Sequence, residues 1–156
     1  MDAREVLAWL ERRGTRRNVQ AMARYGIEAP RAFGVPVGTL IGLAKRLGKD
    51  HARAAALWES GWYEARLVAP MVDDPRLVTR RQMSAWAAAF DNWAVCDHAC
   101  WHLFERTPLA WEKARQWTAT TTQHPGGSAR VAFRSGCHAR SSPATLCRPW
   151  PGRSPR

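Results

Sequence analysis

Acidic residues are missing from the last part of this sequence. None follows Glu112, whereas residues 113–156 hold eight Lys and Arg. That stretch therefore supplies +8 of the formal net charge of +11, and residues 1–112, with 16 Lys and Arg against 13 Asp and Glu, supply only +3. An excess of Lys and Arg over Asp and Glu indicates nucleic-acid binding when it belongs to the folded part of a chain. The overall charge therefore does not identify a function by itself.

Long apolar runs and export signals are also missing. No stretch approaches the roughly 18 apolar residues of a membrane span. The charged start, residues 1–5, does not resemble a secretory signal. Four cysteines, at positions 96, 100, 137 and 147, predict reduced thiols rather than a disulfide framework. We therefore expect a cytoplasmic protein with no membrane partner. The sequence also contains no GxSxG, GxGxxG or P-loop motif.

Residues 118–156 differ in composition from the rest and are predicted to be a disordered basic tail rich in Pro, Gly, Ser and Arg. Five of the ten prolines fall in the last 32 residues, and no apolar stripe recurs there. Such a composition buries too little apolar surface to offset chain entropy. Three interpretations stay open: a tail that adds nonspecific affinity for nucleic acid, a tail without a role, and an out-of-frame translation that replaced further helices.

Residues 1–117 show the apolar periodicity of helices and no strand-like alternation. In residues 37–47, for example, Val37, Leu40, Ile41, Ala44 and Leu47 follow helical spacing. Short helices joined by short turns predict an all-α fold, an α-solenoid of HEAT-like antiparallel helix pairs. The predicted helices cover residues 2–13, 17–25, 37–47, 51–59, 62–72, one that starts at Asp74-Pro75, 83–89, 91–106, and one opened by Thr107-Pro108 that runs to about 117.

The most informative helix is the one predicted over residues 91–106, with Asp91 as its N-cap. At about 100° per residue one arc of this helix holds Trp93, Asp97, Cys100, Trp101 and Phe104. A carboxylate in an aromatic stripe is costly unless it is paired or faces a cleft. The structural interpretation pairs Asp97 with a helix N-terminus or an Arg. The functional interpretation places Asp97 beside an indole, both facing a cationic ligand.

A metal site on the same helix is not predicted. Cys96 and Cys100 lie one turn apart, as do His98 and His102. Each pair points to a different side of the helix, so the four side chains cannot close one tetrahedral site.

Several motifs, in order, resemble the DNA alkylation repair family of HEAT-like, AlkD-type DNA glycosylases over about residues 3–117. The resemblance is carried by Asp91-Asn92-Trp93 with Cys96-Asp97, and by residues 22–27, 33–45 and 57–66. It implies excision of N3- or N7-alkylated purines from duplex DNA without a metal or cofactor. By position it implies that Asp97 is the catalytic carboxylate, that Trp93 lies beside the lesion's deoxyribose and that Tyr25 contacts the lesion.

Trp101 shares the arc of Asp97 and is expected to contact the DNA or the lesion as well. The partner is then double-stranded DNA with alkylated bases, and we expect a monomer that joins the nucleoid when it acts. The resemblance ends at about Trp117, before the helices that in the family supply another Trp and phosphate contacts. Two alternatives are a noncatalytic helical-repeat module that binds DNA or a protein, and a truncated product without function.

Overall fold

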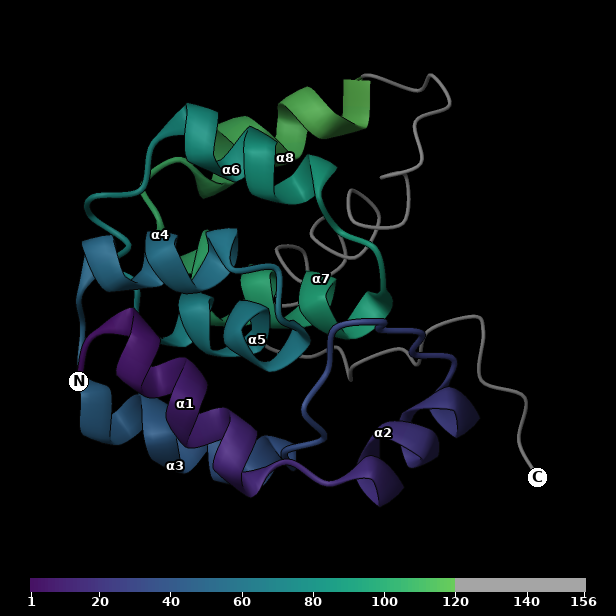
Figure 1. The fold of residues 1–156 in the computed structure, drawn as a ribbon. Helices are drawn as coiled ribbons and strands as arrows, with labels where there is room; N and C mark the ends of the chain where they lie inside the picture. Colours follow the sequence, from purple (N-terminus) through teal and green to yellow (C-terminus); the bar gives the residue numbers. More distant parts are fainter. Residues whose placement is uncertain (120–156) are drawn as a thin grey trace, which may run out of the picture.

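The computed structural model describes residues 1–119, which form eight α-helices, two short 3₁₀ helices and no strand (Figure 1). This confirms the predicted all-α class. The predicted tail lies outside the described residues, except for residues 118 and 119 at the end of the last helix. The elements are α1 (Ala3–Arg13), α2 (Arg16–Met22), η1 (Ala23–Tyr25), α3 (Val37–Leu47), α4 (His51–Glu59), α5 (Tyr63–Val72), α6 (Arg80–Ala88), α7 (Trp93–His102), η2 (Phe104–Arg106) and α8 (Ala110–Ala119).

The helices form two rows that alternate along the chain. In one row α5 packs between α3 and α7. In the other, α1 packs on α4, and α4 meets α6 through stacked indoles. Helix α8 follows beside α6 (Figure 1). Successive pairs that bury a shared core between two rows are the architecture of a HEAT-like α-solenoid, as predicted. None of the helices in residues 1–119 is long and apolar enough to cross a bilayer.

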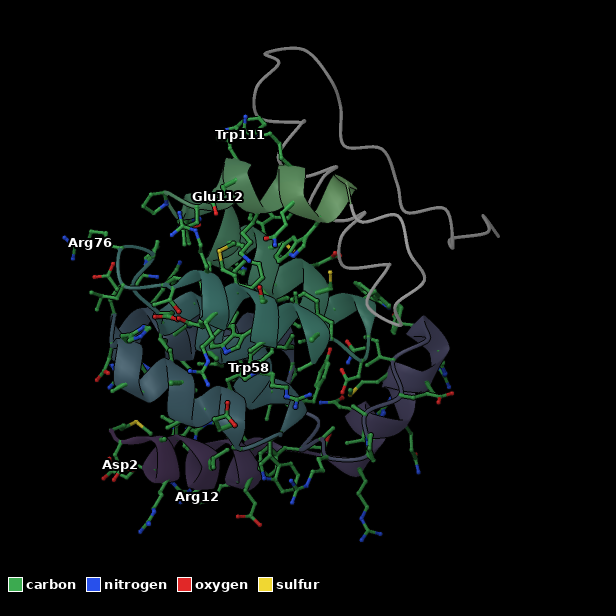
Figure 2. All side chains as sticks on the ribbon, turned by 90° about the horizontal axis from the view of Figure 1, so that it is seen from above. Asp2, Arg12, Trp58, Arg76, Trp111 and Glu112 are labelled. Atoms are coloured by element: carbon green, nitrogen blue, oxygen red, sulfur yellow. The ribbon has the colours of Figure 1, made fainter. Side chains whose placement is uncertain are left out.

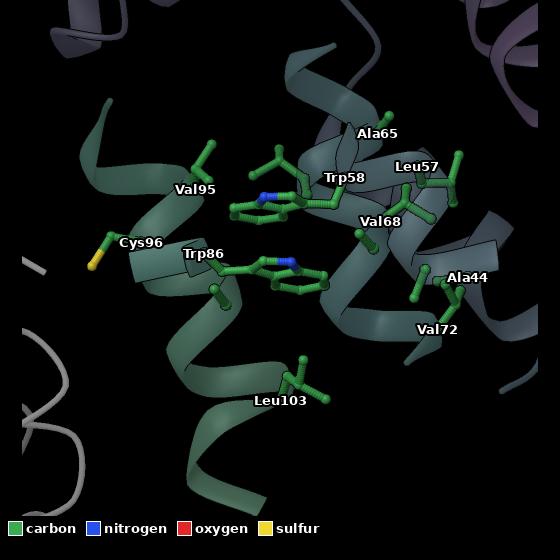
Figure 3. Packing of buried hydrophobic residues seen from close by; sticks show 14 of the residues in the cluster. Ala44, Leu57, Trp58, Ala65, Val68, Val72, Trp86, Val95, Cys96 and Leu103 are labelled. Carbon is green, nitrogen blue, oxygen red and sulfur yellow. The ribbon is translucent and has the colours of Figure 1, made fainter. Parts of the chain in front are cut away.

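Stacked aromatic rings fill the core between α4 and α6. Trp58 and Trp86 lie with ring centroids 4.1 Å apart and planes 4° from parallel. Figure 3 shows the two indoles face to face at the centre of the packing. Phe104 lies 6.5 Å from Trp86 and 6.1 Å from Trp117, measured between ring centroids. The rings thus connect four helical elements, α4, α6, η2 and α8.

Two predicted helix starts are wrong, each because the predicted cap residue makes another contact. Asp91 does not cap α7: its Oδ2 pairs with Arg66 Nη1 at 3.2 Å, and Asn92 accepts the Val95 N–H instead. Asp74-Pro75 opens a turn, in which Asp74 O accepts the Leu77 N–H at 3.0 Å, and no helix begins there. The helix after that turn is α6, which is capped by Thr79.

The predicted helix 91–106 is interrupted at Leu103. Its backbone (φ −130°, ψ −64°) leaves the helix, and η2 follows. Both Leu103 and Phe104 are fully buried, and the irregular turn lets these two consecutive large side chains reach the core. Thr107 then donates its hydroxyl back to Phe104 O at 2.9 Å. The last helix begins only at Ala110, so Pro108 is not its first residue.

A buried carboxylate holds the loop before α3. Glu64, in the first turn of α5, is fully buried. Its Oε2 accepts the Phe33 N–H at 2.9 Å, and its Oε1 accepts those of Gly34 at 2.6 Å and Val35 at 3.2 Å. Buried backbone donors need such partners because unpaired ones are costly. Glu64 thus fixes the loop that leads from η1 to α3.

Glu64→Gln is expected to lower the free energy of unfolding by about 2–4 kcal/mol. The amide keeps one acceptor oxygen and turns an NH₂ group toward a backbone N–H, which is then left unpaired. Urea denaturation followed by far-UV circular dichroism measures the loss. Glu59→Gln is the matched control, because Glu59 is exposed and should change by less than about 0.5 kcal/mol. Equal stability of the two variants would contradict the assigned role of Glu64.

Candidate functional site

An exposed stripe runs along α7 and consists of Trp93, Asp97 and Trp101. The three residues are spaced at i, i+4 and i+8, and neighbours at this spacing lie about 6 Å apart on a helix surface. Trp93 is 39% exposed and Trp101 is 56% exposed, with Asp97 exposed between them. A carboxylate is therefore flanked on both sides by accessible indoles. We call these three residues the α7 stripe.

The predicted arc is wider than the stripe that reaches solvent. Cys100 and Phe104, which the helical wheel placed with Asp97, are both buried. Cys100 lies at the inner edge of the arc, and Phe104 lies beyond the break at Leu103. The arc thus straddles the boundary between core and solvent, and its outer part forms the α7 stripe.

Tyr25 lies beside the α7 stripe although it is 68 positions earlier than Trp93. The Trp93 Nε1–H donates to Tyr25 O at 3.0 Å. The chain can turn at this point because Gly26 adopts φ +68°, a conformation that favours glycine. The Tyr25 side chain is 70% exposed. Three predicted site aromatics and the predicted carboxylate thus share one exposed edge, formed by η1 and α7.

Asp97 has no hydrogen-bond or ion-pair partner among residues 1–119. The structural interpretation required an ion pair with an Arg or a hydrogen bond from a helix N-terminus, and residues 1–119 provide neither. Partial desolvation by its surroundings raises the pKa of Asp97 above the ordinary value. An unpartnered carboxylate between two indoles is arranged to face a cation, since a ring face and a negative charge both attract it.

The polar residues on the other sides of α7 do not extend this stripe. The Cys96 and Cys100 side chains are buried. The rings of His98 and His102 lie 5.1 Å apart, and burial, with a smaller effect of His102, lowers the pKa of His98 to about 4. Within residues 1–119 no three His, Cys, Asp or Glu side chains converge on one point.

The exposed cations differ in whether they are already paired. Arg80, near α8, forms an ion pair with Glu112. Lys45 is exposed, and Arg46 lies over the Trp9 ring at 5.3 Å. Apolar periodicity and motifs did not single out the cations of α2 and η1, of which Arg24 directly precedes Tyr25. A charge count confined to the first 49 residues would have drawn attention to them.

The stacked helix pairs place the protein in the class of HEAT-like helical-repeat proteins. The family whose model is described as DNA alkylation repair enzyme matches residues 6–124. The chain belongs to the DNA alkylation repair enzyme family.

One solved structure with the same fold is described as "A new family of proteins related to the HEAT-like repeat DNA glycosylases with affinity for branched DNA structures". Its TM-score is 0.74 and its sequence identity 22%, and the match covers 88% of this chain and 56% of that one. The likeness at this identity concerns the fold, and the chain spans little more than half of the neighbour's length. No curated protein matches the sequence.

Proposed function

We propose that this protein excises alkylated bases from duplex DNA at the α7 stripe. The observation that carries the proposal is Asp97, an unpartnered carboxylate exposed between Trp93 and Trp101. Membership of the DNA alkylation repair enzyme family supports the same assignment. The protein acts as a monomer in the cytoplasm, on nucleoid DNA, and needs no metal or cofactor.

The chemistry requires little more than these side chains. A purine alkylated at N3 or N7 is positively charged, which weakens its N-glycosidic bond. Cleavage develops positive charge on the deoxyribose, and the carboxylate of Asp97 stabilises that charge and orients the attacking water. Trp93 lies beside the sugar, and Tyr25 and Trp101 contact the lesion. Their ring faces attract a cationic base by cation–π interactions.

A second candidate function is binding of DNA without excision. The solved neighbour is described as having affinity for branched DNA structures, and this chain spans only part of that protein's length. The same exposed aromatics would then stack on unpaired bases at a junction. The two functions differ in whether Asp97 takes part in chemistry.

Release of 7-methylguanine from a methylated duplex tests the proposal. We expect the purified full chain to release the base faster than the same duplex does spontaneously without protein. Base release is measured by chromatography over a time course with protein in excess of DNA. Release at the spontaneous rate would exclude excision by this chain, and binding to a branched DNA in the same preparation would then favour the second function.

A further inference from the structure

Charge is distributed unevenly along the described part of the chain. Residues 1–49 hold ten Lys and Arg against four Asp and Glu, a net charge of +6. Residues 50–112 hold six Lys and Arg against nine Asp and Glu, a net charge of −3. The small net charge of the helical body thus conceals a strongly basic first third, which contains α1, α2 and α3.

Ion pairing sharpens this difference. In residues 50–112, four arginines pair with acidic side chains: Arg53, Arg66, Arg76 and Arg80. In residues 1–49, no Lys or Arg side chain forms an ion pair with any residue that the structure describes. Paired cations are partly neutralised, whereas unpaired ones attract a polyanion. The free positive charge therefore gathers on the first three helices.

Helix α2 contains no acidic residue, its two arginines are exposed, and none of its residues is fully buried. At about 100° per residue Arg16, Arg17 and Gln20 of α2 fall within roughly 100° of each other, and Arg24 follows them in η1. All of these side chains are exposed. We call this surface the α2 basic face, formed by Arg16, Arg17, Gln20 and Arg24.

Backbone contacts hold α2 in place although none of its residues is fully buried. Gly34 O accepts the Thr15 N–H at 3.3 Å and the Asn18 Nδ2–H at 2.8 Å. At Gly34 (φ +84°) a Cβ would lie 2.2 Å from Thr15 O, so only glycine permits this close approach. The α2 basic face is thus presented on a fixed support, which Glu64 also holds through the Gly34 N–H.

The α2 basic face leads directly to the α7 stripe. Arg24 precedes Tyr25, whose carbonyl accepts the Trp93 indole N–H. The ten residues of α2 and η1 extend about 15 Å back from Tyr25, at the rise per residue of an α-helix. Beyond their far end lie Arg12 and Arg13 of α1, with Arg13 over the Trp9 ring at 4.0 Å. Figure 2 shows Arg12 projecting from the outer surface of α1.

We propose that the α2 basic face binds the phosphates of a DNA strand, on one side of the nucleotide that meets the α7 stripe. The position of that nucleotide rests on the proposed function, whereas phosphate binding by α2 does not require excision. Guanidinium groups suit phosphate because they donate two hydrogen bonds at once. A row of cations about 15 Å long spans several phosphates of one strand.

Salt-dependent binding of undamaged duplex DNA tests this proposal. The triple variant Arg16→Gln, Arg17→Gln and Arg24→Gln is titrated against a fluorescent duplex by anisotropy at several salt concentrations. Three lost phosphate contacts should make the slope of log K against log salt shallower by about 2–3. Affinity at 0.1 M salt should fall on the order of a hundredfold. The corresponding triple Lys variant, which keeps the charge, should retain most of the wild-type slope.

The matched control removes the same charge elsewhere, at Arg76, Arg80 and Arg81, also as Gln. Arg76 and Arg80 already pair with acidic residues, so the slope should change by less than about 1. Equal losses in the two triple variants, or an unchanged slope in the α2 variant, would overturn the proposal. So would a wild-type chain that does not bind duplex. Because this duplex carries no lesion, the result is independent of whether the protein releases 7-methylguanine.

Discussion

Asparagine in place of Asp97 is expected to lower the rate of 7-methylguanine release from methylated duplex by on the order of a hundredfold or more. The amide has almost the same shape as the carboxylate but no negative charge. It therefore cannot stabilise the positive charge that develops on the deoxyribose. Single-turnover rates with protein in excess of DNA isolate the bond-breaking step from product release.

The expected loss is specific to Asp97. Asp74→Asn makes the same chemical change in a turn that pairs with Arg76 and should leave the rate unchanged within about twofold. Asp97 accepts no hydrogen bond from residues 1–119, so its replacement should not lower the melting temperature, and duplex binding should persist. A variant that melts like the wild type and releases 7-methylguanine at the wild-type rate would exclude Asp97 as the catalytic residue.

Alanine in place of Trp86 is expected to cost about 3–5 kcal/mol of unfolding free energy. The indole is 4% exposed and stacks on Trp58, so truncation leaves a cavity where four helical elements meet. The total free energy of unfolding of a domain of this size is about 5–15 kcal/mol. The loss would therefore remove a large fraction of its stability. Urea denaturation monitored by far-UV circular dichroism measures the change.

Trp111→Ala is the control for that loss. Trp111 lies on α8 and is 53% exposed, and Figure 2 places it at the periphery of the molecule, whereas Trp58 lies in the interior. Its truncation should change stability by less than about 0.5 kcal/mol. If the Trp86 and Trp111 variants unfolded at the same urea concentration, the stacked rings would not be the centre of the core.

Helix periodicity predicted the fold well because the solenoid is built from local units. In α5, the residues Ala65, Val68, Ala69 and Val72 follow helical spacing on one face, and all four are buried. Periodicity was less reliable in α3. Val37 and Ile41 belong to the predicted stripe, yet they are 41% and 36% exposed, and Leu43 is buried instead. The apolar residues of this helix are compatible with more than one buried face, and the packing of the partner helix determines which face is covered.

Helix boundaries depended on ion pairs that the propensities of single residues do not indicate. Asp91 is an ordinary N-cap residue, but Arg66, 25 positions earlier, draws its carboxylate away, and Asn92 takes the role. Asp74 likewise bonds Arg76 within a turn. Both corrections reflect ion pairs formed by the folded chain. No propensity of the residue itself could have indicated them.

The candidate site could be predicted only in part for the same reason. A helical wheel places Trp93, Asp97 and Trp101 on one side, and the structure exposes all three. Spacing within one helix could not show that Cys100 turns inward. Nor could it show from the residues alone that Tyr25 lies beside Trp93, because that contact depends on how α2 and η1 are held by the loop at Gly34 and Glu64.

The hydrogen bond between Trp93 and Tyr25 also makes the site depend on the completeness of folding. Contacts in a solenoid join mostly neighbouring repeats, whereas this one closes a chain loop of 68 positions. Such high contact order is entropically costly until the intervening helices have stacked. A chain in which α3 or α5 is undocked would still carry Asp97 on α7 but would lack its aromatic neighbour from the other end of the stack. Under the proposed function, competence to engage a damaged nucleotide is therefore acquired late and as a whole, and not helix by helix.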